Sequence, residues 1–299
     1  MDLDQIRTFL EVAKQENFSK AAEKVFRSQP AVSAQIRQLE QEYQQKLFDR
    51  SGKSVRLTPA GELLRDYAQQ MLRIHRDSLS AVSSSTGIVR GVLSIGANEG
   101  TFLYVLPEIF KRFHSAYPEV RIDVYRNFSH KVVQKLAEGA LDVGIVTLPV
   151  KDPMLKVTPI YRDELLLAVD PRVPIAAKKL VTIDEVAALP LIFPKIGYTR
   201  RLMEKVLRPY RSTLRISMEL GSIGMIKQFV AAGFGASLIS PSFAREEMKS
   251  GKLRLIQVKD LDAWRELGVV YRKDRTLPRV ASAFVEQVKK GLAETATDA

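Results

Sequence analysis

Close to the N-terminus, apolar residues recur at the three- and four-residue spacing of an amphipathic helix. One helical face collects Ile6, Phe9, Leu10 and Ala13. This spacing predicts a first helix from Leu3 to about Gln15. A second, shorter helix is predicted from Lys20 to Val25, with Ser19 as its N-cap.

A third helix is predicted directly after the second. Ser28 is a suitable N-cap, and Pro30 is tolerated in the first turn because the N–H that proline lacks has no helical partner there. Val32, Ile36 and Leu39 continue the apolar stripe. Two short helices joined by a tight turn are typical of a helix-turn-helix, whose second helix enters the major groove. A small helical bundle that binds no DNA has the same spacing, so spacing alone leaves both interpretations open.

A basic hairpin is predicted after the third helix. Leu47-Phe48-Asp49-Arg50 leads into the turn Ser51-Gly52-Lys53-Ser54, and residues 55–58 form a short strand. We expect a two-stranded wing whose basic side chains lie along the phosphate backbone. The residues expected to face DNA are Ser28, Gln29, Pro30, Ala31, Ser33, Ala34, Arg37, Arg50, Lys53 and Arg56. Among them, Gln29 can pair with adenine, and an alanine methyl group can touch the methyl group of thymine.

An apolar stripe then continues along one long helix, predicted from Pro59 to about Ser85. The stripe consists of Leu64, Ala68, Met71, His75, Leu79 and Val82. A lone helix cannot bury such a stripe on itself, so it needs a partner. That partner is either the same helix of a second copy or the globular part of this chain.

From Gly91 onward the pattern alternates between strands and helices. Strands are predicted at 92–96, 121–125 and 143–146, with helices at 104–114 and from Ser129 between them. This βαβαβ order predicts a parallel sheet covered by helices. A second set of elements contains strands at 165–169, 191–193, 214–220 and 236–239, and helices near 198–210 and 223–232. We expect two α/β lobes, lobe I at about 91–162 and 266–299 and lobe II at about 163–265.

The composition argues against several classes of protein. The 299 residues carry a net charge of +12, which suits a polyanionic partner because bound Lys and Arg release counterions from phosphates. There is no cysteine, and His75, His114 and His130 have no metal-ligand spacing. Gly233-Phe234-Gly235 follows a helix, the reverse of a dinucleotide fingerprint. We therefore expect no enzymatic activity, no metal and no cofactor.

The N-terminal residues lack the basic stretch and apolar run of a signal peptide. No apolar run is long enough to span a bilayer. These features predict a cytoplasmic protein without a membrane partner.

Five blocks in the N-terminal region together resemble the signature of LysR-type transcriptional regulators. They are residues 17–22, 28–33, 36–40, 47–50 and 57–61, and further similar positions are Pro107, 117–118, 141–146 and 232–235. The resemblance covers essentially the whole chain. Two departures stand out: Tyr43-Gln44-Gln45 replaces a frequent glycine, and Ala34 replaces a frequent arginine.

The resemblance implies a winged helix-turn-helix at 1–58, a dimerising linker helix at 59–86 and an effector domain at 91–299. The two lobes of that domain resemble type II periplasmic binding proteins. A transcription regulator of this kind binds double-stranded DNA at an inverted repeat, as a homodimer or homotetramer, acts with RNA polymerase and responds to a small-molecule effector. A free solute-binding protein is the alternative, which the attached winged domain and the missing signal peptide disfavour.

Ligands of such sheets bind beyond the C-terminal ends of the strands, where helix N-termini present N–H groups to anions. The residues expected there are Asn98, Glu99, Gly100, Thr101, Phe128, Ser129, Thr147, Ile196, Thr199 and Ser222. The hydroxyl groups among them suit a small anion or carboxylate. Glu99 suits an ammonium group or points to solvent, and Ser129 and Ser222 are equally well explained as helix N-caps.

Overall fold

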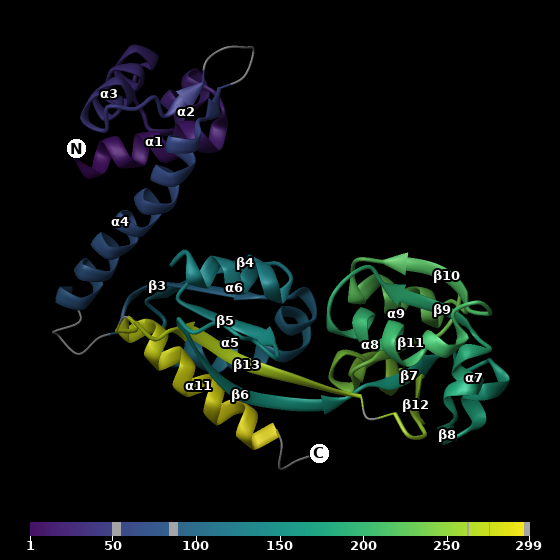
Figure 1. Cartoon of the computed structure of the whole chain (residues 1–299). Helices are drawn as coiled ribbons and strands as arrows, with labels where there is room; N and C mark the ends of the chain where they lie inside the picture. The colour runs from purple at the N-terminus through teal and green to yellow at the C-terminus, as the bar shows by residue number, and fades with distance from the viewer. Residues whose placement is uncertain (50–54, 84–88, 262, 275, 296–299) are drawn as a thin grey trace. The chain divides into compact units, whose positions relative to one another are not determined.

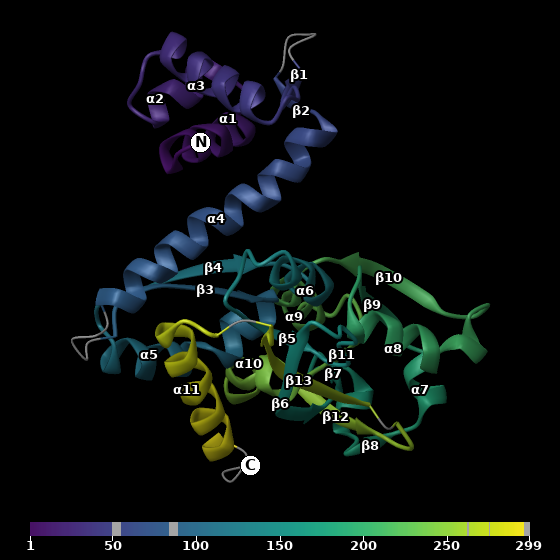
Figure 2. The same cartoon turned by 60° about the vertical axis from the view of Figure 1, so that its left-hand side comes forward.

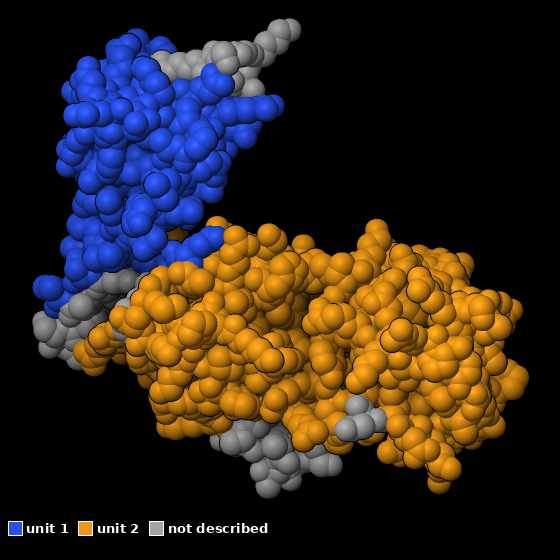
Figure 3. Space-filling model, viewed as in Figure 1, with its two compact units in different colours: residues 1–88, 138–140 blue, residues 89–137, 141–299 orange. Residues whose placement is uncertain are grey.

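The computed structural model describes residues 1–49, 55–83, 89–261, 263–274 and 276–295 (Figure 1). The chain divides into two compact units, residues 1–88 with 138–140 and residues 89–137 with 141–299 (Figure 3). The predicted wing residues Arg50 and Lys53 lie outside the described residues.

The first unit contains four helices and a short antiparallel strand pair among its described residues. They are α1 (Leu3–Gln15), α2 (Phe18–Lys24), α3 (Gln29–Glu42), β1 (Phe48–Asp49), β2 (Arg56–Leu57) and α4 (Pro59–Ser83). Phe48 joins the core, with its ring centroid 5.4 Å from that of Phe9 and 5.8 Å from that of Phe18. The four helices and the wing strands therefore share one apolar core.

One of the N-caps predicted from the sequence is confirmed by the structure, and another is not. Ser28 caps α3, accepting a hydrogen bond from the N–H of Ala31 over 3.4 Å. The predicted N-cap of α2 was wrong: Asn17 caps it, because its side chain accepts the N–H of Lys20 over 3.0 Å, and the helix begins at Phe18. At Gln44 the backbone adopts φ 52°, a left-handed conformation that glycine would adopt without steric cost.

Helix α4 uses the two halves of its predicted apolar stripe differently. Leu64 and Ala68 are buried in the core of the first unit, and Met71 packs against it. Leu79 and Val82, further along, are exposed. Gly61 is required near the start, because a Cβ there would lie 2.1 Å from the carbonyl oxygen of Leu47. Part of the apolar stripe is therefore buried within this chain, and part of it is exposed.

In the second unit, lobe I is built on a five-stranded sheet in the order β4-β3-β5-β13-β6. Its strands are β3 (Gly91–Ala97), β4 (Val120–Arg126), β5 (Val143–Thr147), β6 (Leu155–Glu164) and β13 (Trp264–Arg272). The first three are parallel, as predicted, and β13 is antiparallel to both β5 and β6. The ten-residue strand β6 was not predicted.

Helices cover both faces of this sheet. α5 (Pro107–Ala116) and α11 (Arg279–Thr295) pack on one face and α6 (Ser129–Ala137) on the other (Figure 2). The helix predicted at 104–114 is divided into a short π-helical segment, η2 (Thr101–Val105), and α5, which starts at Pro107. Proline at the first position of a helix sets a new start, because it cannot donate to the preceding turn.

Lobe II contains a four-stranded sheet in the order β11-β7-β12-β8 and the parallel pair β10-β9. The strands are β7 (Leu166–Val169), β8 (Leu180–Val181), β9 (Pro190–Pro194), β10 (Arg215–Leu220), β11 (Ser237–Ile239) and β12 (Arg254–Val258). The helices are η3 (Pro174–Ala177), α7 (Ile183–Ala187), α8 (Tyr198–Val206), η4 (Arg208–Tyr210), α9 (Ile223–Ala231), η5 (Pro241–Phe243) and α10 (Arg245–Lys249). Strands β6 and β13 connect the two lobes (Figure 1).

Candidate nucleic-acid interface and effector cleft

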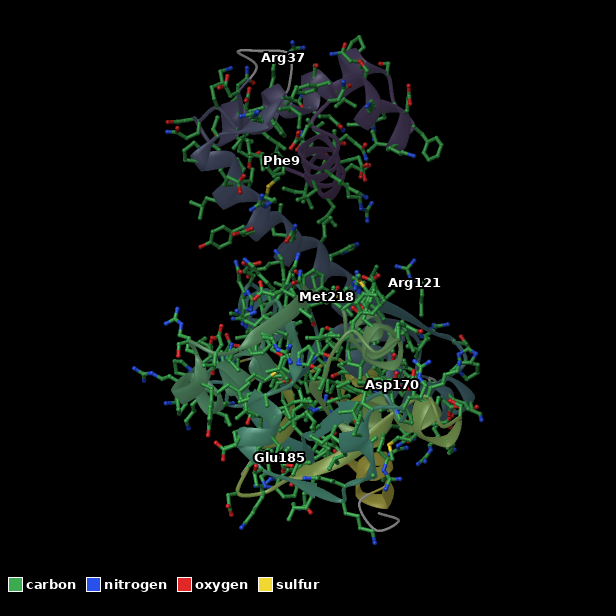
Figure 4. The ribbon with its side chains drawn as sticks, turned by 90° about the vertical axis from the view of Figure 1, so that its right-hand side faces the viewer. Phe9, Arg37, Arg121, Asp170, Glu185 and Met218 are labelled. Carbon is green, nitrogen blue, oxygen red and sulfur yellow. The ribbon has the colours of Figure 1, made fainter. Side chains whose placement is uncertain are left out.

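The exposed face of α3 carries most of the predicted DNA-facing residues. Ser28, Gln29, Pro30 and Arg37 are exposed, and Ala31 and Ala34 are half-buried. Arg37 lies on the outer side of α3, away from the core residue Phe9 (Figure 4). Arg56 is exposed on the wing strand β2. Ala34 lies on the same helical face as Pro30 and Arg37, so it leaves a shallow surface between their larger side chains.

Ser33 behaves differently from the other residues of this set. Its side chain is only 6% exposed, and its hydroxyl accepts a hydrogen bond from the Gln29 amide over 3.0 Å. Ser33 therefore faces the domain core and restrains Gln29. Two further contacts fix α3 on α1: Thr8 donates to Gln35 over 2.7 Å and Gln5 donates to Gln38 over 2.8 Å.

In the second unit, the loop after β3 is held mainly by its own contacts. The side chain of Asn98 accepts the N–H of Thr101 over 2.9 Å. A Cβ at Gly100 would lie 2.6 Å from the ring of Phe243 in lobe II, so the lobes approach closely here. Thr101 is completely buried, and its hydroxyl has no hydrogen-bond partner among the described residues. In this conformation Thr101 is not accessible to a ligand.

Glu99 joins the two lobes. Its Oε1 accepts a hydrogen bond from the hydroxyl of Ser222 over 2.6 Å, and its Oε2 lies 3.3 Å from Nη1 of Arg126. Ser222 is also the N-cap of α9, accepting the N–H of Met225 over 3.4 Å. The side chain of Glu99 is 21% exposed, so it does not point freely to solvent. A carboxylate of lobe I therefore occupies the N-terminal end of a lobe II helix.

The remaining predicted effector residues lie at strand ends and helix starts. The hydroxyl of Ser129 accepts the N–H of Thr147 over 3.1 Å, tying the first turn of α6 to the end of β5. The ring of Phe128 stacks on His130 with centroids 6.3 Å apart. Ile196 is exposed, and Thr199 lies in the first turn of α8, whose N-cap Gly197 provides no side-chain hydrogen bond. The N-terminus of α8 is therefore less fully capped than that of α9.

A groove beside this helix was missed by the sequence analysis. It has a volume of about 510 Å³ and is lined by Leu148, Pro149, Val150, Val157, Arg162, Tyr198, Trp264 and Glu266. The guanidinium of Arg162 lies 4.5 Å from the ring centroid of Trp264, and the hydroxyl of Tyr198 donates to the Trp264 carbonyl over 2.5 Å. The groove could not be predicted without β6, because the pairing of β6 with β13 brings Arg162 opposite Glu266.

A buried ion pair anchors the connecting strands to lobe II. Asp163 and Arg265 face each other across β6 and β13, with a shortest N–O distance of 2.8 Å. The hydroxyls of Ser240 and Ser242 both donate to the carboxylate of Asp163. Burial raises the pKa of the neighbouring Tyr161, and the negative charge of Asp163 raises it further. This polar cluster is closed off from water and holds the strands where they enter lobe II.

No helix in the part of the chain that the structure describes is long and apolar enough to cross a membrane. No group of three or more His, Cys, Asp or Glu side chains within the described ranges is arranged to hold a metal ion.

Comparison with known proteins agrees with this arrangement. Residues 3–62 match the bacterial regulatory helix-turn-helix protein family, lysR type, and residues 86–293 match the LysR substrate binding domain. The chain belongs to the LysR family. It is a transcriptional regulator with a helix-turn-helix DNA-binding domain and an effector-binding domain, as predicted. The curated relatives of this family are described as regulators of transcription.

Curated relatives align over nearly the full length of this LysR-family chain. A probable RuBisCO transcriptional regulator of Synechocystis sp. is 30% identical over 293 residues, covering 96% of this chain and 85% of the relative. A protein with the same description from Guillardia theta is 28% identical, covering 96% and 94%.

Solved structures show the same fold. Full-length CbnR complexed with its target DNA is 21% identical with a TM-score of 0.74, covering 97% of this chain and 99% of CbnR. A full-length OxyR variant from Pseudomonas aeruginosa is 23% identical with a TM-score of 0.72, covering 97% and 95%. The winged helix-turn-helix and the two-lobed effector domain predicted from the sequence are thus confirmed.

Proposed function

We propose that this regulator binds an inverted-repeat operator as a homodimer formed through α4. The supporting observation is a second apolar stripe, Leu63, Tyr67 and Ile74, whose side chains are all more than half exposed. Steps of four and seven residues place these three side chains on one helical face. A second copy of α4 is the partner that covers such a face, and two dimers pair further where the regulator forms a tetramer.

A symmetric dimer presents two copies of α3 to DNA. Each recognition helix reads one half-site, so the two-fold symmetry of the protein is repeated in the operator. Base contacts come from Gln29, Pro30, Ala31 and Ala34, and phosphate contacts from Ser28, Arg37, Arg50, Lys53 and Arg56. Ser33 contributes by holding Gln29.

The effector is a small anion or carboxylate bound between the lobes. The incompletely capped N-terminus of α8 favours negative charge, and Arg162 supplies a cation in the neighbouring groove. Thr199 and the loop at Ile196 border this position, and Ser129 and Thr147 border it from lobe I. The apolar part of the effector packs on Trp264. The effector does not contact Asn98, Gly100 and Thr101 directly. These residues shape the loop that carries Glu99.

The effector acts by linkage. A ligand that binds one arrangement of lobes or subunits more tightly shifts the population toward it, and DNA affinity changes by the same coupling free energy. The bound dimer then alters transcription through RNA polymerase at the promoter.

Selection of genomic fragments by the full-length protein tests this function. At moderate salt and with competitor DNA, we expect enrichment of short inverted repeats. Retention without sequence preference would leave only the electrostatic attraction that the charge of +12 explains. Metabolite fractions are then added to the selected operator, and transcription is measured with purified RNA polymerase. No change in operator affinity or transcript level with any fraction would contradict the sensing role.

A further inference from the structure

Phe26 lies in the turn between α2 and α3 and is 95% exposed, the highest value among the large apolar side chains that the structure describes. Its backbone adopts φ 54°, in the left-handed region that β-carbon-bearing residues avoid. An aromatic side chain at this position neither contributes to the core nor relaxes the backbone.

The hydrogen bonds around this turn show that Phe26 occupies the left-handed position that ends helix α2. The N–H of Arg27 donates to the carbonyl of Ala22 over 3.0 Å, and the N–H of Phe26 donates to Glu23 over 3.3 Å. The first of these bonds is the six-to-one bond of a Schellman motif, in which the left-handed residue is usually glycine. Folding therefore favours glycine here, and the phenylalanine needs another explanation.

The position of Phe26 in the helix-turn-helix indicates which partner its exposed ring contacts. Phe26 precedes Gln29, the first residue of α3, by three positions, so their Cα atoms lie within about 11 Å. Arg27 is directed to Asp4 of α1, with an N–O distance of 3.3 Å. The exposed side chains of Lys20 and Lys24 lie on the preceding helix and suit a polyanion. DNA that accepts the start of α3 therefore passes close to Phe26.

We propose that Phe26 reads DNA: its ring packs on the methyl group of a thymine at the edge of each half-site. Phenylalanine is one of the side chains that make this apolar contact in the major groove. This inference rests on DNA binding by the helix-turn-helix and is independent of the effector. It adds a sequence-reading residue in front of the recognition helix.

The variant Phe26→Gly tests the proposal in the full-length protein, with an operator selected from random duplexes. Because the side chain is exposed and glycine suits the left-handed backbone, the midpoint of thermal unfolding does not fall. Operator affinity of the dimer falls about sixteenfold, because a buried methyl group worth about fourfold is lost at each of the two half-sites. Replacing the thymine of one half-site by deoxyuridine weakens the wild type about fourfold and leaves Phe26→Gly unaffected. Phe26→Leu, which keeps an apolar side chain, recovers part of the affinity.

Gln44→Gly is the matched control. Gln44 is exposed, neutral and left-handed at φ 52°, and the N–H of Gln45 donates to the Glu40 carbonyl in the same six-to-one pattern. We expect this variant to bind the operator like the wild type. Unchanged affinity and base preference in Phe26→Gly would overturn the proposal, as would an equal loss in Gln44→Gly. A loss in Phe26→Gly with equal deoxyuridine effects in both proteins would refute the thymine contact.

Discussion

The hydroxyl of Ser222 donates a hydrogen bond to Glu99 over 2.6 Å, although the two residues are 123 positions apart and lie in different lobes. Glu99 thereby takes the place at the N-terminus of α9 where an anionic ligand is otherwise stabilised. Within the described part of the chain, the second carboxylate oxygen pairs with Arg126, whose side chain is largely exposed. The two lobes are therefore joined by a polar contact that needs no ligand.

Removing this contact should loosen the lobes. In Glu99→Ala we expect a broader distribution of inter-lobe distances, because the charge-assisted bond to Ser222 is lost. The chain has no cysteine, so spin labels at Glu119→Cys and Lys205→Cys, both exposed, are unique. In a double-mutant cycle that combines Glu99→Ala with Ser222→Ala, the coupling free energy between the two side chains should be on the order of 1 kcal/mol.

Glu108→Ala is the control for this experiment, because Glu108 is exposed in lobe I and lies 3.9 Å from the exposed Lys111. Its distance distribution should equal that of the wild type. If Glu99→Ala also matched the wild type, Glu99 would not restrain the lobes.

The buried Asp163–Arg265 pair predicts an asymmetric response to mutation. Asp163→Ala leaves the Arg265 charge buried without its carboxylate, so the free energy of unfolding of the effector domain should fall by about 3 kcal/mol. Replacing both residues by apolar ones, in Asp163→Leu with Arg265→Met, should restore most of that loss. Denaturant unfolding measures both changes, and a double variant no more stable than the single one would contradict this view.

The contact between Ser33 and Gln29 predicts a loss of specificity without a loss of folding. Ser33→Ala releases the Gln29 amide, so discrimination of an operator adenine should weaken, by less than the roughly tenfold expected for Gln29→Ala. Affinity for the operator and its single-base variants measures the effect. Ser19→Ala is the control, since Ser19 is exposed and does not cap α2. Equal behaviour of the two serine variants would argue against the restraint.

The exposed stripe of α4 predicts where the dimer breaks. Ile74→Glu places a charge in the proposed helix pair, so sedimentation should show monomers, and affinity for an inverted repeat should approach that for one half-site. Gln69→Glu, on the opposite face of the same helix, should remain dimeric. A dimer that persists in Ile74→Glu would show that the dimer interface lies elsewhere.

Much of this fold could be predicted from local patterns. The first helix, the third helix with its cap at Ser28 and the parallel strands of lobe I depend on periodicity and capping, which act over a few residues. The family resemblance also depends on short blocks such as residues 28–33. The strand β6 escaped prediction because its pairing with β13 joins segments about a hundred residues apart.

The sequence by itself determined the element types, the two-part organisation and the family, because these follow from near neighbours along the chain. Only the tertiary structure decided which polar side chains of the predicted sites are available. Ser33 turned inward to Gln29, Glu99 reached Ser222, and half of the α4 stripe was buried in its own unit. The contact of Glu99 and the burial of α4 depend on partners that folding brings together from distant positions. Ser33 and Gln29 are only four residues apart, but the packing of α3 on the core decides which face of that helix is buried.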